Sequence, residues 1–442
     1  MRLRTWIAIA SFAVSSIGFS PAAADTAAQV EPCKIQSPDT TTHMRIGWPV
    51  DKDALKSVGK VNFLVLVVDF SDDPLSNFDV EKYRQKMELY TVASYFNFVS
   101  NGLFTPTFTI YPSYVRMPES SKHYGDQLEV DEVVNGEWES HHMTHDAIEA
   151  VDSTVKISDF DAAIVVVSGG SSLSGRVALA TSQDEGLDEH DSGEIHNTIL
   201  AGIQAFSTEG IRPWAIIVHE INHLLGLVDL YLYEADGWWK GKSTGAFGMQ
   251  GFLRGSNGTD SLGWNRWLRG WMPESRILCI DSPKNLENIK MSALTSIDSS
   301  YEMVVIKTSP TVVYVVEALK NKGFEASTFG NSLLVYKVDA TVKPGFGPVR
   351  IIPKKTKITT APLSSALPDW VRFQEAPLRV FEQVFSEGML FRNTNYESGA
   401  LTFSLFTGAS ALSEQKKVPK TINCKIGKKV VKIKGFSPTC PN

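Results

Sequence analysis

Residues 211–231, IRPWAIIVHEINHLLGLVDLY, decide how this chain must fold around one site. An apolar run leads into His219 and His223, which are four residues apart. On an α-helix, residues four apart lie one turn above each other on the same face. Both imidazoles can therefore reach one cation, and Glu220 beside them can reach a water bound to it. We interpret this stretch as a buried helix that carries part of a zinc site.

The third ligand must come from beyond the helix, because a catalytic zinc usually has three protein ligands and an open position for water. If the helix continued, Asp229 would lie about 9 Å further along its axis than His223, at roughly 1.5 Å per residue. Gly226 allows the chain to turn back, since glycine enters a left-handed helix cap without steric cost. A bare H-E-x-x-H arises by chance, but these further positions favour metal. The sequence predicts a Zn2+ site of His219, His223 and Asp229, with Glu220 as general base.

Composition and charge exclude several classes of protein. The chain has 442 residues, enough for two or three domains. Its formal net charge of -6 gives no reason to expect nucleic acid or an anionic membrane as partner. No apolar run reaches the roughly 20 residues that span a bilayer, so we expect no stable membrane insertion. The oligomeric state stays open, with a monomer as the default.

Residues 1–24 have the features of a secretory signal peptide. Arg2 and Arg4 precede an apolar run, and Ala22 to Ala24 form an A-x-A cleavage site. The alternative is a membrane anchor, but the run is too short to span. We therefore expect cleavage near Ala24 and a secreted mature chain.

The four cysteines fit an oxidising compartment. Three pairings are formally open. We favour Cys424 with Cys440, which flank a short basic stretch, and Cys33 with Cys279. The alternative is that the Cys33 thiolate holds the zinc in a latent form, but the even number of cysteines favours disulfides.

Apolar and amphipathic stretches alternate through the first half of the chain, which predicts an α/β layer with one twisted sheet. The strand at 197–207, just ahead of the zinc helix, could border the cleft and pair with an extended substrate. The predicted strands are residues 61–70, 107–111, 160–168 and 197–207, and the predicted helices are residues 80–100 and 128–152.

Two further groups of polar residues are candidate metal sites. Residues 181–196 are acidic and could bind Ca2+, but they lack regular calcium-loop spacing, so a solvated loop is favoured. His141, His142 and His145 include a pair four residues apart. No carboxylate stands where a general base would be needed, so we interpret them as a polar helix face.

Residues 245–251, GAFGMQG, predict a tight glycine turn that places Met249 in a confined space beneath the metal. The alternative is an ordinary core methionine in a loop. Residues 262–271 contain three tryptophans and predict a helix that packs on the core.

Several ordered segments together resemble the immune inhibitor A family of secreted metalloproteases, within the wider metzincin class. The resemblance covers roughly residues 61–339. Its segments are VVDFSDDP, VASYFNFVSNGLFTPTFTI, DAAIVVVSGG, HEINHLLGLVDLY, FGMQG, SLGWNRWLRGW and VVYVVEALKNKGFEASTFGNSLLVYKVD.

The resemblance implies a metzincin-like catalytic domain, with a twisted mixed sheet and packed helices, that acts on protein or peptide substrates. It implies His219, His223 and Asp229 as zinc ligands, Glu220 as general base and Met249 as the methionine-turn residue. Metzincins commonly have a third histidine where this chain has Asp229, and the alternatives here are Glu234 and Asp236. Family members often carry an aspartate-rich calcium loop, which residues 156–160 (KISDF) lack.

Beyond residue 275, short β-rich runs with turn signals predict a β-sandwich-like domain, followed by a small basic disulfide tail to which we assign no function. The expected divisions are a signal peptide at 1–24, an N-terminal segment at 25–59, a catalytic domain at 60–275, a β-rich domain at 276–410 and a small module at 411–442.

The expected reaction is hydrolysis of peptide bonds by a metal-activated water. Tyr231 or Tyr233 could donate a further hydrogen bond to the oxyanion, given their closeness in sequence. Two alternatives remain open. The chain could be a catalytically inactive binding or adhesion protein on this scaffold, or another zinc hydrolase such as a cell-wall amidase.

Overall fold

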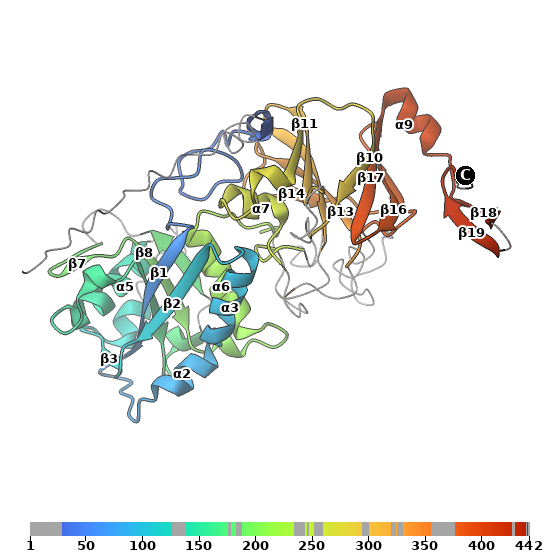
Figure 1. Cartoon of the computed structure of the whole chain (residues 1–442). Coiled ribbons are helices and arrows are strands. Elements are labelled where there is room, and N and C mark those ends of the chain that lie inside the picture. The colour runs from blue at the N-terminus through green and yellow to red at the C-terminus, as the bar shows by residue number, and fades with distance from the viewer. Residues whose placement is uncertain are drawn as a thin grey trace, which may run out of the picture.

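The computed structural model describes most of the chain (Figure 1). The predicted signal peptide lies outside the described residues, as do Glu234, Asp236 and residues 183–187 of the acidic loop. The described residues are 29–125, 138–175, 178–182, 188–233, 244, 247–251, 260–293, 300–319, 324, 330–354, 376–426, 429–438 and 440.

A six-stranded, mostly parallel sheet and the helices packed on it form the first lobe. The strand order is β2-β1-β4-β8-β5, with β3 beside β1, and the edge strand β5 runs antiparallel to β8. β1 and β4 are buried on both faces over most of their length, as expected of apolar runs in a parallel sheet. The strands are β1 (Gly59–Asp69), β2 (Phe104–Ile110), β3 (Val115–Arg116), β4 (Ala162–Val167), β5 (Leu179–Ser182) and β8 (Asn197–Gly202).

Helices cover both faces of this sheet. α3 (Leu89–Val99) and α6 (Pro213–Leu224) share a hydrophobic core with one side of β1, including Phe63. The alternate residues of β1, such as Leu64, pack on the other face with α5 (Trp138–Asp152). The predicted mixed α/β layer is therefore confirmed, and α6 is packed on one face of its sheet.

Two details of the first lobe differ from the predictions. Residues 80–100 form two helices, α2 (Val80–Lys86) and α3, because Glu88 between them has a left-handed φ of 53°. The strand predicted at 197–207 ends at Gly202, and β8 is paired on both sides, by β4 and β5. β8 therefore cannot pair with a substrate, and the open edge on this side of the described sheet belongs to β5.

Two further sheets form the second lobe, in the orders β14-β13-β12-β11-β9 and β10-β17-β16-β15. One apolar cluster joins them, and the rings of Tyr314 and Phe391 stack within it at 5.5 Å. This arrangement agrees with the predicted β-sandwich-like domain. The strands are β9 (Ile277–Ile280), β10 (Leu286–Met291), β11 (Met303–Ser309), β12 (Val312–Ala318), β13 (Leu333–Asp339), β14 (Val349–Ile351), β15 (Gln383–Ser386), β16 (Met389–Glu397) and β17 (Ala400–Thr407).

The tryptophan-rich segment lies between the lobes rather than within the first. Its helix, α7 (Gly263–Leu268), packs with the N-terminal segment on the outer face of the five-stranded sheet. The ring of Trp48 contacts those of Trp264 and Trp267, with centroids 5.3 and 4.6 Å away, and only Trp271 belongs to the core of the first lobe. The predicted helix is therefore present and packs on a hydrophobic core, which it shares with the N-terminal segment and the five-stranded sheet.

Both predicted disulfides are present, Cys33 with Cys279 and Cys424 with Cys440. The first occupies the Cys33 sulfur, so the alternative of a latent zinc held by this thiolate is wrong. No helix among the described residues is long and apolar enough to cross a membrane. The remaining elements are β6 (Glu189–His190) and β7 (Gly193–Glu194) in the acidic loop, α9 (Gly408–Glu414), and the C-terminal hairpin of β18 (Lys420–Ile426) and β19 (Lys429–Gly435).

Candidate metal centre

The end of α6 turns sharply, as the sequence predicted. The helix begins at Pro213 and ends at Leu224, and Gly226 follows with a φ of +82°. A Cβ at this position would lie 2.9 Å from the carbonyl oxygen of His43 and 3.2 Å from Nη1 of Arg269. Glycine is therefore required both by the left-handed backbone and by the neighbouring atoms.

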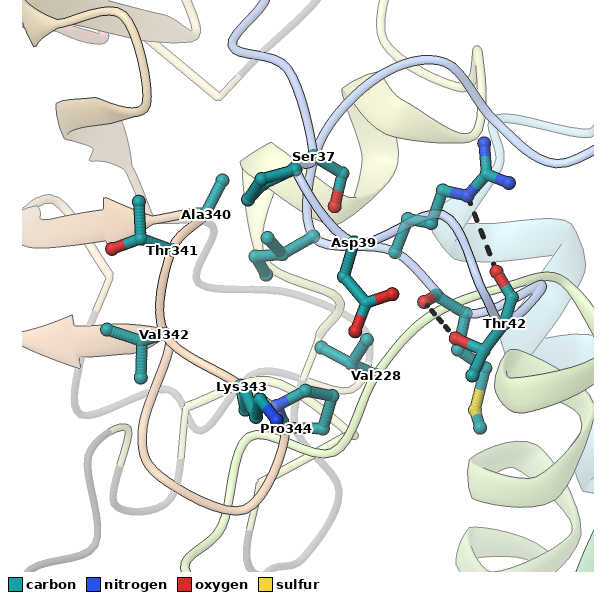
Figure 2. A pocket seen from close by; sticks show the side chains of 13 residues that line it. Ser37, Asp39, Thr42, Val228, Ala340, Thr341, Val342, Lys343 and Pro344 are labelled. Atoms are coloured by element: carbon teal, nitrogen blue, oxygen red, sulfur yellow. Dashed lines mark hydrogen bonds between the residues drawn. The ribbon is translucent and has the colours of Figure 1, made fainter.

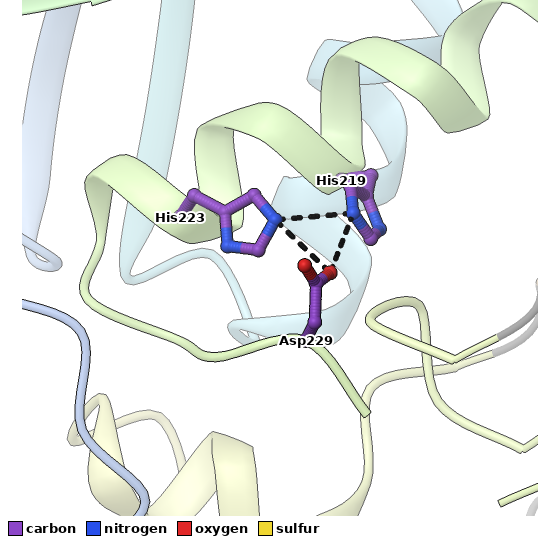
Figure 3. Close-up of side chains that lie close together, drawn as sticks. All are labelled: His219, His223 and Asp229. Carbon is purple, nitrogen blue, oxygen red and sulfur yellow. Dashed lines mark hydrogen bonds and ion pairs between the residues drawn. The ribbon is translucent and has the colours of Figure 1, made fainter. Parts of the chain in front are cut away.

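This turn brings Asp229 back to the two histidines (Figure 3). Oδ1 of Asp229 lies 3.1 Å from Nε2 of His219 and 3.3 Å from Nε2 of His223, and the two nitrogens are 3.1 Å apart. Among the described residues, this is the one group of three such side chains whose donor atoms all lie within 4.8 Å of one another. The three side chains that the sequence predicts as ligands therefore lie close together in the structure.

The backbone decides which nitrogen of each imidazole faces the group. Nδ1 of His219 is 3.0 Å from the carbonyl oxygen of Met249, and Nδ1 of His223 is 2.8 Å from that of Leu227. A carbonyl oxygen only accepts, so each Nδ1 must carry the hydrogen and donate it. Each neutral imidazole then presents the lone pair of Nε2 to the centre, which is the form that binds a metal.

The two Nε2 atoms and Oδ1 of Asp229 are all acceptors, so they repel one another unless a positive charge lies between them. The buried Oδ1 of Asp229 receives no well-aligned hydrogen bond, which leaves an orphaned oxygen that a cation would satisfy. A tetrahedral zinc with ligands about 2.0–2.1 Å away places those ligand atoms roughly 3.3 Å apart. The observed separations of 3.1, 3.1 and 3.3 Å fit such an ion.

The carboxylates beside His219 make its imidazole more basic. Burial lowers the pKa of His219, but the carboxylates of Asp229 and Glu220 outweigh it and raise this pKa to about 9. Burial alone would raise the pKa of Asp229, but the two imidazoles hold it well below its usual range. A proton on His219 therefore competes with any metal for the same lone pair.

Glu220 lies on the same helix beside the histidines and is buried. Burial raises the pKa of its carboxyl group, partly opposed by the histidine charges and by a hydrogen bond from the backbone N–H of Ala180. Ala180 belongs to the edge strand β5. Glu220, the predicted general base, therefore lies beside the edge strand β5.

The two tyrosines predicted as oxyanion partners have different surroundings. The hydroxyl of Tyr233 donates to Oδ2 of Asp229 at 2.7 Å, so it supports the carboxylate. The ring of Tyr231 stacks on that of His219, with centroids 6.1 Å apart and an angle of 28° between the ring planes. Neither contact tests the proposed hydrogen bond to an oxyanion, but the Tyr233 hydroxyl already has a partner in Asp229.

Met249 lies in a turn next to the histidines, and Gly248 before it has a φ of +80°. Its side chain is buried in the core of the first lobe, and its carbonyl oxygen orients His219. Residues 245 and 246 of the predicted glycine turn lie outside the described residues. The backbone carbonyl of Met249 is therefore one contact between this residue and the site.

Sequence reasoning missed the residues that support the site from behind. Asn222 donates to Oε1 of Gln250 at 3.1 Å, and Nε2 of Gln250 approaches the ring of His223 at 3.3 Å. The N-terminal segment supports the turn, because the N–H of Arg45 donates to the carbonyl of Gly226. Asn222 and Gln250 stand inside the quoted motifs, so closeness to the ligands could have drawn attention to them.

The second histidine group does not behave as predicted. His141 is only 5% exposed, so the prediction of a polar helix face is wrong for this residue. His145 stacks on His190 of the acidic loop with ring centroids 4.9 Å apart. His145 therefore joins α5 to the acidic loop.

The sequence matches no protein-family model and no curated protein. The resemblance to immune inhibitor A proteases therefore stays a prediction, and the site has to be judged by its geometry. Two imidazole nitrogens and one carboxylate oxygen form a donor set of the kind that catalytic zinc prefers. The residues present fit that ion.

Proposed function

We propose that this chain is an exported zinc endopeptidase that hydrolyses peptide bonds with Glu220 as general base. The observation that carries the proposal is the convergence of two Nε2 atoms and one carboxylate oxygen at distances of 3.1, 3.1 and 3.3 Å. Asp229 would complete the zinc shell with His219 and His223. The bound ion would lower the pKa of its water and polarise the substrate carbonyl.

The protein's own groups account for the proton transfers. The Glu220 carboxylate accepts a proton from the attacking water and later delivers it to the leaving amine. Its buried position raises its pKa, which suits a group that must hold a proton during the reaction. The N–H of Ala180 keeps the carboxyl group beside the edge of the sheet.

The edge strand β5 supports a peptide as substrate. β5 is the last strand on this side of the described sheet, where it pairs with β8. A peptide that adds to a sheet edge is held through its backbone, without regard to its side chains. This moves the predicted substrate-pairing role from β8 to β5.

Export of the chain is part of the proposal. The two disulfides fit an oxidising compartment. The predicted signal peptide at residues 1–24 would supply the route, with cleavage near Ala24.

The test compares the wild type with Glu220→Gln, which keeps the size of the side chain but removes the base. We expect the variant to bind zinc as the wild type does and to cleave casein about 10²–10⁴-fold more slowly. A zinc chelator should abolish wild-type cleavage, and added zinc should restore it. Casein cleavage by Glu220→Gln at the wild-type rate would contradict the proposal, as would cleavage of peptidoglycan alone.

A further inference from the structure

A turn of the second lobe contacts the segment that carries Asp229. It joins β13 to β14 over residues 339–348. The backbone N–H of Tyr233 donates to the carbonyl oxygen of Gly345 at 3.0 Å. Gly345 has a φ of +78°, and a Cβ there would lie only 2.0 Å from Cδ2 of the Tyr233 ring. The tyrosine ring therefore lies directly against the Cα of this glycine.

The turn is braced by its own hydrogen bonds. The N–H and the hydroxyl of Thr341 both donate to Oδ1 of Asp339, at 3.1 and 2.6 Å. Nε of Arg350 donates to the carbonyl oxygen of Gly347 at 3.1 Å, and the N–H of Asp339 donates to that of Pro348 at 2.9 Å. A turn fixed in this way can hold a neighbouring side chain in place.

Beside this contact, the turn and the first lobe are separated by a cavity of about 440 Å³ (Figure 2). Val228 lines it on one side and residues 340–344 on the other, with Asp39 of the N-terminal segment between them. The contact at Gly345 is the hydrogen-bonded contact that the described residues show between this turn and the segment that carries Asp229.

That contact leads to the metal centre through one side chain. The Tyr233 hydroxyl donates to Oδ2 of Asp229 at 2.7 Å, while Oδ1 faces the histidines. We infer that Gly345 is a positioning residue of the metal centre: it seats the Tyr233 ring, and Tyr233 holds Asp229 in reach of His219 and His223. This inference rests on the proposed zinc site and adds that the second lobe completes it.

The test is a double-mutant cycle with metal affinity as the readout. Gly345→Ala must displace the tyrosine ring, and Tyr233→Phe removes only the hydroxyl from a side chain that is 53% exposed. We expect each variant to bind Zn2+ roughly 10–100-fold more weakly, the usual cost of losing an outer partner of a ligand. The double variant should lose no more than either single variant, because both changes break one connection.

Gly388→Ala is the matched control. Gly388 also belongs to the second lobe and also has a φ of +78°, but a Cβ there would meet no atom within 4 Å. It carries the same backbone strain without touching a ring, so its zinc affinity should equal that of the wild type. The absorption spectrum of bound Co2+ should change in Gly345→Ala and Tyr233→Phe, and stay unchanged in Gly388→Ala.

The outcomes separate the inference from the proposed function. If the wild type binds zinc and both single variants bind it with the wild-type affinity, the inference is wrong while the zinc site stands. Additive losses in the double variant would also overturn it, since Gly345 would then act by another route. If the folded wild type takes up no zinc at all, both the site and the inference are wrong.

Discussion

Helices α5 and α6 each carry two histidines four residues apart, but they use them differently. On α6, His219 and His223 bring their Nε2 atoms to 3.1 Å and meet Asp229. On α5, His141 and His145 belong to no group of three donor side chains within the described ranges, and the His145 ring stacks on His190. Spacing places two side chains on one helix face, but it does not decide where their rings point.

Two features present at α6 explain the difference. Backbone carbonyls of Met249 and Leu227 accept from the two Nδ1 atoms and turn the Nε2 atoms inward. Gly226 then returns the chain so that Asp229 can reach them. A metal site therefore needs oriented rings and a third donor as well as the helical repeat.

The largest expected effect comes from removing one histidine of the α6 pair, and removing one histidine of the α5 pair is the comparison. His219→Ala should reduce zinc affinity by more than the roughly 10–100-fold that an outer partner contributes, because it deletes a direct ligand. His145→Ala, which removes one histidine of the α5 pair, should leave the zinc content unchanged. Metal analysis of the purified, folded variants measures both, and equal loss of zinc in the two would remove the distinction between the helices.

The second prediction concerns the turn at Gly226, which follows α6 and brings Asp229 to the two histidines. Gly226 and Gly270 both follow the end of a helix, with φ of +82° and +75°. Alanine at either should cost about 1–2 kcal/mol of unfolding free energy through left-handed strain. Only Gly226→Ala also meets an obstacle, since a Cβ would lie 2.9 Å from the His43 carbonyl, whereas Gly270 has open space.

We therefore expect Gly226→Ala to weaken zinc binding and to lose more stability than Gly270→Ala, which should leave zinc binding intact. Thermal unfolding reports the strain in both variants, and zinc titration reports the position of Asp229. Wild-type zinc affinity in Gly226→Ala would mean that Asp229 is held in place by its later contacts, such as Tyr233, and not by the turn.

The parts of this site that could be predicted are those encoded locally. The helical spacing of His219 and His223 and the need for a turn at Gly226 depend on residues that are close in sequence. The buried strands β1 and β4 were also predictable, because unbroken apolar runs indicate burial on both faces.

The parts that could not be predicted depend on residues far apart in sequence. Helical periodicity continues across Glu88, so only the backbone shows the break there. Which strand takes the sheet edge depends on pairing, and β5 is only four residues long. The contact of Tyr233 with Gly345 joins two lobes, and no local pattern around either residue indicates it.

The smallest expected effect tests whether Met249 orients His219 through its backbone or through its side chain. Met249→Leu keeps the carbonyl oxygen that lies 3.0 Å from Nδ1 of His219 and replaces the buried thioether by a side chain of similar volume. Such swaps usually cost less than about 1.5 kcal/mol, so zinc affinity should change only a few-fold.

Zinc titration together with thermal unfolding of Met249→Leu checks this expectation. A loss of zinc affinity as large as that of Gly226→Ala, in a variant that unfolds at nearly the wild-type temperature, would assign the orienting role to the sulfur side chain. A small change would mean that a carbonyl of the peptide backbone is enough to turn the ring. Any buried residue of similar size could then stand at position 249, and what separates α6 from α5 would be the path of the main chain behind the histidines.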